Sequence, residues 1–289
     1  MENIRERIVS CAGRIWFCAK ELLKWLALAM ITGVPCGIIG AAFDLAVEHV
    51  TELRTEHTAI LFLLPVIGLV IVAFYKAAKL EGVSTDDMID CVKDGKPIRF
   101  WLLPVMFIST VLTHLGGGSA GREGAALQMG GTIGWWAGGV LHLNEHERRM
   151  AVQCGMAAFF SALFSTPLAA TFFAMTIVNV GVVFYAAYIP CFAAALIAYG
   201  ISLLIGVSPT RFAVDVPAFE PAMAVRVVLL ALACAVVVHL FCFVLHSAAH
   251  GLPKLLPNPW VRAFLGGCVV VLFTLLYGDM RYNGAGVNI

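Results

Sequence analysis

The sequence predicts an all-α, polytopic membrane protein whose helices are interrupted at several points. Of its 289 residues, 61% are hydrophobic and 13% are charged, whereas about 25% of the residues in a soluble domain are charged. A soluble chain of this length would need a charged exterior around its core. Long windows contain no Asp, Glu, Lys or Arg, and the longest runs from Met150 to Thr210. Lipid is therefore the expected surrounding of most of the chain.

The first 22 residues have mixed charge. Basic and acidic side chains alternate along Met1–Lys24, with no compact apolar core followed by a small-residue cleavage site. We expect residues 1–22 to form an amphipathic helix at the membrane surface. Residues 23–289 are expected to supply the membrane helices of a single transmembrane domain.

Two apolar segments follow, Leu23–Val50 and Ala59–Ala78. The loop Lys76–Arg99 is rich in Lys and Arg, whereas Thr51–His57 has Arg54 as its only Lys or Arg. Because cytoplasmic loops carry the excess of Lys and Arg, we place the N-terminus and the Lys76–Arg99 loop in the cytoplasm. The protein is expected in the cell membrane.

Gly82–Lys93 is too polar to cross a membrane. Ser84 or Thr85 has the chemistry of a helix N-cap, and Asp86 and Asp87 would lie in the first turn. A short helix at the cytoplasmic face is expected here.

The remaining apolar segments are separated by glycine, proline and polar breaks, which are expected at His142–Arg149, Thr166–Pro167, Asn179–Gly181 and Ser208–Pro217. The segments are Arg99–His114, Gly124–Leu141, Arg149–Phe164, Pro167–Val178, Phe184–Ile205, Met223–His250 and Pro259–Tyr277. A simple span needs about 20 apolar residues. Several of these segments are therefore too short or too broken to span alone.

The segment most informative about function is the Gly-rich turn, residues 116–124, with five glycines around Arg122 and Glu123. Charges at membrane depth cost at least about 2.5 kcal/mol each and mark functional sites. A helix starting near Gly121–Gly124 would direct free N–H groups and its dipole at an anion. Glu123 is expected to occupy the anion's place when ionised and to leave it when protonated, and so to act as a gate, a proton carrier, or both.

These glycines have two other possible interpretations. The spacing Gly116-x-Gly118-x-x-Gly121 matches a dinucleotide fingerprint, but the flanking βαβ unit and the later acidic residue are missing. The glycines could instead serve only close helix packing. Packing alone does not explain Arg122 and Glu123.

The segments Gly121–Gly124, read as Gly-Arg-Glu-Gly, and Gln128–Gly131 resemble the CLC family of chloride channels and anion/proton antiporters. Arg99–Pro104 and Ala157–Ala169 support the resemblance. It implies a fold of tilted, broken and re-entrant helices, a homodimer with one pathway per subunit, and halide transport. Chloride is the first expectation, and a fluoride/proton antiporter is the alternative.

The same resemblance implies site residues. Glu123 is the gate, and the expected anion-binding residues are Ser84, Gly121, Arg122, Gly124 and Ala125. The family's first anion-filter stretch reads Gly-Ser-Gly-Ile-Pro. The matching segment of this sequence, Gly82–Asp86, reads Gly-Val-Ser-Thr-Asp and so departs from it. Thr176 or Ile177 stands where proton-coupled members carry an inner glutamate, which favours a passive channel or a different proton route.

The sequence gives little support to a nucleic-acid-binding or metal-binding protein. The net charge of +1 and the absence of a basic stripe argue against nucleic acid. The cysteines form no Cys-x-x-Cys pair, and His246 with His250 lacks a third ligand, so no metal or cofactor is expected. His114 is either a pore-side hydrogen-bonding group or a packed polar residue.

A membrane enzyme would need a nucleophile with its base, or two paired carboxylates. The sequence shows no such partner for Glu123, so catalysis is not expected. The Gly-rich motif has no clear second copy, and the chain stops in a loop at Ile289. The sequence is therefore expected to be cut short at its C-terminus, and a non-conducting fragment is a further alternative.

Overall fold

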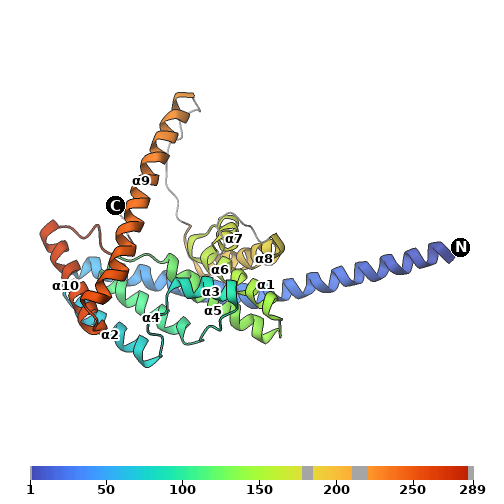
Figure 1. Ribbon diagram of the computed structural model, residues 1–289, viewed down its shortest axis with the longest axis horizontal. Helices are drawn as coiled ribbons and strands as arrows, with labels where there is room; N and C mark the ends of the chain where they lie inside the picture. The colour runs from blue at the N-terminus through green and yellow to red at the C-terminus, as the bar shows by residue number, and fades with distance from the viewer. Residues whose placement is uncertain (1, 178–184, 210–220, 286–289) are drawn as a thin grey trace.

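The computed structural model describes residues 2–177, 185–209 and 221–285 of the chain (Figure 1). Within these ranges every regular element is a helix, as the sequence predicts. The elements are α1 (Glu2–Glu56), η1 (Thr58–Leu63), α2 (Leu64–Ala77), α3 (Thr85–Asp94), α4 (Leu102–Leu115), α5 (Glu123–Val140), α6 (Glu145–Phe164), α7 (Pro167–Thr176), η2 (Tyr185–Ala187), α8 (Tyr188–Ile205), α9 (Pro221–Leu255) and α10 (Pro259–Tyr277). The expected break at Asn179–Gly181, most of the Ser208–Pro217 loop and the last residues before Ile289 lie outside the described residues.

Five helices of the described chain are long and apolar enough to cross a membrane. They comprise Ala19–Glu56, Thr58–Ala77, Tyr188–Ile205, Met223–Leu255 and Pro259–Tyr277. The apolar helices α4 and α7 are shorter. At about 1.5 Å per residue, the 10 residues of α7 reach only about half of a hydrocarbon core of about 30 Å. Short helices joined by sharp breaks are thus a real feature of this fold.

Helix α1 differs from the expected division at residue 22. It runs without a break from Glu2 to Glu56, with Pro35 inside it. Its N-terminal part projects from the other helices in Figure 1. The sequence around residue 22 holds no glycine or proline, so nothing there ends a helix. A surface position for residues 1–22 stays a prediction.

Capping boxes fix where two helices begin. The backbone N–H and the hydroxyl of Ser84 both bond to Asp87 Oδ2, at 2.7 and 3.2 Å, in a capping box that starts α3. This confirms the expected short helix. A second capping box joins Asn144 and Glu147 at the start of α6. Because this cap satisfies the free N–H groups of the first turn, α6 begins at Glu145, four residues before the expected start at Arg149.

The core forms where α1, α4, α5, α6 and α8 pack together. Its largest fully buried side chains include Leu28, Phe43 and Phe159. Helices α5 and α6 approach with almost no side chain between them: a methyl group on Gly155 would lie 2.1 Å from the carbonyl oxygen of Gly130. Close packing of this kind is what small residues provide between membrane helices. Gly130 and Gly155 therefore serve close packing, and so does Gly116 of the turn, where a methyl group would lie 2.9 Å from the side chains of Leu64 and Ile67.

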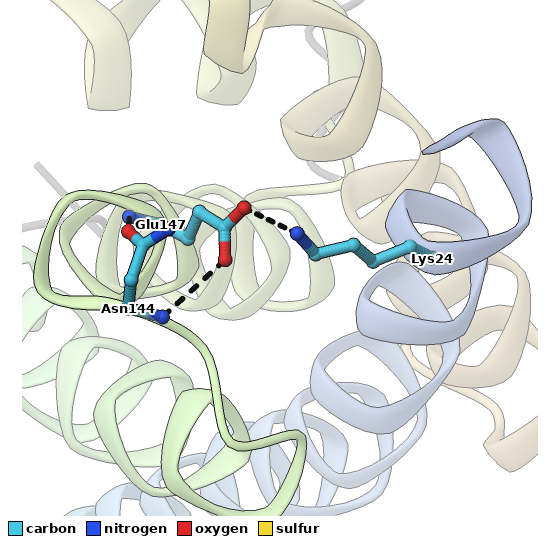
Figure 2. Close-up of polar contacts among 3 residues, drawn as sticks. All are labelled: Lys24, Asn144 and Glu147. Carbon is cyan, nitrogen blue, oxygen red and sulfur yellow. Dashed lines mark hydrogen bonds and ion pairs between the residues drawn. The ribbon is translucent and has the colours of Figure 1, made fainter. Parts of the chain in front are cut away.

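An ion pair between Lys24 of α1 and Glu147 of α6 ties these two helices together (Figure 2). Glu147 also accepts from the backbone N–H of Asn144 at 3.3 Å. The side chains of Lys24 and Glu147 are 31% and 19% exposed. One carboxylate thus both caps α6 and fixes the start of α6 against α1.

Candidate anion site

The Gly-rich turn joins the end of α4 to the start of α5. The N–H groups of Gly116 and Gly118 bond to the carbonyls of Leu112 and Thr113, at 3.0 and 2.8 Å, and so end α4. Gly117 has φ of +79°, a left-handed conformation that side chains disfavour. The turn is therefore a helix-ending motif followed by a new helix start, as the glycines predict.

The N-terminus of α5 is open. No side chain caps α5 at its N-cap residue, Arg122. The first intrahelical bond runs from the N–H of Ala126 to the carbonyl of Arg122, at 2.9 Å. The N–H groups of Glu123, Gly124 and Ala125 precede it and have no carbonyl partner within the helix. Together with the helix dipole, such groups attract an anion without a fixed positive charge.

Glu123 is the first residue of α5, and its carboxylate folds back over the turn. A methyl group on Gly121 would lie 2.1 Å from Glu123 Oε2. Only glycine leaves room for the carboxylate in this place. The side chain of Glu123 is exposed, so it is free to leave the turn.

Arg122 forms an ion pair with Asp44 of α1, outside the turn. Its guanidinium carbon also lies 5.9 Å from the centre of the Phe164 ring. Both charged side chains are largely buried, at 16% and 14% exposure. Because Asp44 compensates Arg122, the guanidinium adds little net positive charge to the turn. Asp44 was not anticipated from the sequence, which gives no local signal for a partner 78 residues away.

Helix α3 supplies the neighbouring wall. A methyl group on Gly124 would lie 3.1 Å from Thr85 Oγ1, and Thr85 Oγ1 accepts from Gln128 Nε2 at 3.2 Å. The expected anion-binding residue in this segment is Ser84, whose hydroxyl is engaged with Asp87 in the capping box. Thr85 is thus the hydroxyl that the fold brings to the turn. A role for Ser84 in anion binding stays a prediction.

Thr176 lies in the last turn of α7, and its hydroxyl bonds to the carbonyl of Phe172 at 2.8 Å. It is not part of the turn that gathers Gly121–Ala125. The rings of His246 and His250 lie 4.2 Å apart on α9. In the described residues no three His, Cys, Asp or Glu side chains gather closely enough to hold a metal ion.

The comparison with known families decides the class of the protein. A family model described as voltage gated chloride channel matches residues 67–288. The chain belongs to the voltage-gated chloride channel (CLC) family. The matched range includes the Gly-rich turn, α3 and α5.

Curated relatives of this CLC chain are channels and exchangers. A chloride/fluoride channel protein of Pseudomonas syringae pv. tomato is 30% identical over 266 residues, which cover 90% of this chain and 58% of the relative. An H⁺/Cl⁻ exchange transporter of Cronobacter sakazakii is 34% identical over 171 residues, covering 53% of this chain and 36% of the relative. The CLC chain therefore spans only part of the length of the curated relatives it matches.

Solved structures agree with the family. The crystal structure of a CLC-type fluoride/proton antiporter superposes with a TM-score of 0.86 at 28% identity, covering 93% of this chain and 69% of that one. A slow cyanobacterial Cl⁻/H⁺ antiporter matches with a TM-score of 0.71 at 22% identity, covering 86% and 63%, and supports the fold alone. The broken-helix architecture is thus that of CLC proteins.

Proposed function

We propose that this protein carries a halide anion across the cell membrane along a path that passes the N-terminus of α5, with Glu123 as the gate. The observation that carries the proposal is the position of the Glu123 carboxylate, folded over Gly121 beside the uncapped N–H groups of α5. An ionised carboxylate and a halide compete for the same donors. When the carboxylate is protonated, it loses its charge and its attraction to the helix N-terminus.

The electrostatics of the site suit conduction. An ion must bind strongly enough to enter and weakly enough to leave. Backbone N–H groups of Gly124 and Ala125 offer partial charges, whereas the full charge of Arg122 is compensated by Asp44. We infer that Gly121, Gly124 and Ala125 shape the anion site directly and that Arg122 acts mainly through its backbone.

We propose that the start of α3, which corresponds to the family's first anion-filter stretch, forms one wall of the anion site. Thr85 Oγ1 is the hydroxyl next to Gly124 and is available to donate a hydrogen bond to a halide while it accepts from Gln128. Ser84 would contribute only if its hydroxyl left Asp87. The position of the family's inner glutamate, Thr176, has no charge at neutral pH, so any proton transfer at the inner side would use another route.

Two halides are candidates. Chloride is proposed first. Fluoride coupled to protons is the second candidate, because one relative is named as a chloride/fluoride channel protein and the structure superposing at a TM-score of 0.86 is a fluoride/proton antiporter. Both candidates place the protein among transporters and not among enzymes.

The membrane arrangement completes the proposal. We place the N-terminus and the Lys76–Arg99 loop in the cytoplasm, as the positive charge of that loop indicates. A homodimer with one pathway in each subunit is proposed by analogy with the family. Light scattering in detergent would report twice the chain mass for a dimer, and a mass of one chain would contradict it.

Flux measurements test the function and the gate together. The protein is reconstituted in liposomes, and halide efflux is followed with chloride and fluoride electrodes while external pH is recorded. We expect efflux from the unaltered protein and a changed halide rate and proton movement in Glu123→Gln. The matched control is Glu145→Gln, which alters an exposed glutamate that is likewise the first residue of a helix. Absence of efflux would contradict the function, and an unchanged Glu123→Gln would contradict the gate.

A further inference from the structure

The start of α3 packs against one face of α5. On α5 this face consists of Gly124, Gln128 and Gly131, which follow one another at helical spacing. A methyl group on Gly124 would lie 3.1 Å from Thr85 Oγ1, and one on Gly131 would lie 3.0 Å from Met88 Sδ. Between the two glycines, Gln128 is the residue of this face that carries a side chain, and that side chain reaches Thr85.

The amide of Gln128 is buried between the two helices. The residue is 6% exposed. Its Nε2 donates to Thr85 Oγ1 at 3.2 Å, and its Oε1 has no hydrogen-bond partner among the described residues. A hydroxyl has one proton and two lone pairs. Because Thr85 accepts in this bond, it keeps its own proton for another group.

Thr85 differs from other helical threonines of this protein in the use of its proton. The hydroxyls of Thr113 and Thr132 donate to the carbonyls four residues earlier, at 2.8 and 2.7 Å, a common bond of threonine inside a helix. Thr85 is the first residue of α3, so no turn of this helix precedes it. Among the hydrogen bonds of the described residues, Thr85 Oγ1 accepts one and donates none. Its proton is therefore free for a ligand.

An ion at the α5 N-terminus can meet Thr85 but not Gln128. Thr85 and Gly124 are partly exposed and Glu123 is exposed, whereas Ala125 and Gln128 are buried. The accessible part of the site thus includes the hydroxyl of Thr85 and excludes the amide behind it. Any effect of Gln128 on an anion therefore passes through Thr85.

Stability alone does not explain an amide at position 128. A buried carbonyl without a donor lowers the stability of the fold, and an apolar side chain of similar size in its place is neutral or stabilising. The contact of Met88 with Gly131 already packs α3 against α5 without a polar group. The amide is better explained by the hydroxyl that it orients.

We propose that Gln128 is a positioning residue of the anion site, which holds the Thr85 hydroxyl as a donor toward an ion at the α5 N-terminus and so sets the preference between halides. This inference rests on the proposed function, because it needs a halide beside Gly124. Fluoride is smaller than chloride, so it approaches a donor more closely and is attracted more strongly. A fixed hydroxyl donor therefore favours fluoride over chloride.

The ratio of fluoride to chloride efflux from liposomes tests this inference. Gln128→Leu replaces the amide by an apolar side chain of similar size, and we expect it to lower the ratio by about threefold. Thr85→Val removes the hydroxyl and keeps the shape of the side chain, so it should lower the ratio further. Thr85→Ser keeps the hydroxyl and should retain the ratio. An unchanged ratio in Thr85→Val would overturn the inference, whether or not Gln128→Leu folds.

The matched control is Gln153→Leu on α6. Gln153 is likewise buried, at 3% exposure, and its Nε2 donates to the carbonyl of Ala174 on α7 at 3.5 Å. This substitution also removes a buried amide and its hydrogen bond, but it does not touch Thr85. We expect the halide ratio of Gln153→Leu to equal that of the unaltered protein. A fall as large as that of Gln128→Leu would mean that any lost buried amide has this effect.

Combining the substitutions shows whether Gln128 acts through Thr85. In a chain that already carries Thr85→Val, Gln128→Leu should leave the halide ratio unchanged, because no hydroxyl remains to be oriented. A fall by the same factor in both backgrounds would mean that Gln128 acts in another way. A rise of the ratio in Gln128→Leu alone would mean that the amide takes the proton of Thr85. Either result would overturn the inference.

The melting temperature in detergent separates positioning from packing. Gln128→Leu is expected to melt at the same temperature as the unaltered protein or higher, because it removes the unpaired carbonyl. A lower melting temperature together with an unchanged halide ratio would mean that Gln128 only joins α3 to α5.

This inference and the proposed function fail in different ways. Titration calorimetry of fluoride and chloride into the purified chain measures binding without transport. A chain that moves no halide but loses fluoride affinity relative to chloride in Gln128→Leu would reject the transport function and retain the role of Gln128. Efflux of both halides at one ratio in the unaltered protein, Gln128→Leu and Thr85→Val would reject this inference alone. A chain that binds neither halide would reject both.

Discussion

At the scale of single residues, the close contact of Glu123 with Gly121 defines the candidate gate. The carboxylate lies where a Gly121 side chain would be, and the helix start beneath it has free donors. This arrangement explains why a glycine precedes the Arg-Glu pair. It also means that the gate is sensitive to a single added methyl group.

Gly121→Ala is expected to displace the Glu123 carboxylate from the turn, because the new methyl group would lie 2.1 Å from Oε2. Halide flux in liposomes should then lose most of its pH dependence, while the melting temperature changes little. The control is Gly266→Ala on α10, where an added methyl group meets nothing within 4 Å. Flux that keeps its original pH dependence in Gly121→Ala would show that the carboxylate position is not the gate.

At the scale of the elements, the contact between α5 and α6 is the most tightly packed. Gly155→Val places a branched side chain 2.1 Å from the carbonyl oxygen of Gly130, and backbone atoms cannot turn aside. We expect destabilisation of about 2–3 kcal/mol, seen as a lower melting temperature in detergent. Gly200→Val on α8, where nothing lies within 4 Å, controls for the change in helix propensity. Equal melting temperatures for the two variants would contradict the packing described.

The packing of α3 against α5 and α6 can be measured by the reactivity of a cysteine in α3. Cys91 is buried in α3, and burial raises the pKa of its thiol to about 12. Because the thiolate is the reactive form, maleimide should label Cys91 slowly from pH 7 to about pH 10 in the folded protein. Asp87→Ala removes the capping box of α3 and is expected to speed labelling. The comparison uses a variant in which Cys91 is the only cysteine, and rapid labelling at pH 7 without the Asp87 change would show that α3 is not docked.

Several helix boundaries followed from local chemistry, at a cap, a proline or a glycine. Ser84, Pro167 and Gly278 mark the start or end of helices that the sequence predicts within a few residues. The start of α6 was missed because Asn144 and Glu147, which cap it, lie in a segment taken as a polar break. The length of α1 was missed because charge, which set the expected boundary at residue 22, does not end a helix.

At the scale of the whole molecule, the site divides into a local and a non-local part. The turn from Gly116 to Ala125 is contiguous, so its glycines and charges could be interpreted from sequence. Asp44, Thr85 and Arg54 reach the turn only through the packing of α1 and α3 against α4 and α5. Hydrophobic periodicity and composition do not show which helices pack together. The positions of these three residues at the turn could therefore not be predicted from the sequence.

The chain covers 58% of the chloride/fluoride channel relative. Within the described part, the side chains of α9 are almost wholly exposed, as expected for a helix facing lipid or further protein in a membrane. The Gly-rich turn, α3 and α5 are nevertheless fully formed. The residues of the proposed gate, Gly121 and Glu123, both lie in this part of the chain.

The pH dependence of halide flux is the most direct test of the central claim. Chloride and fluoride efflux from liposomes are measured at pH 4.5 and 7.5 for the unaltered protein and for Glu123→Gln. The account predicts faster efflux at pH 4.5 for the unaltered protein, because protonation frees the carboxylate from the α5 N-terminus, and nearly equal rates at both pH values for Glu123→Gln. Efflux from Glu123→Gln that still rises at low pH by the same factor as the unaltered protein would contradict the account.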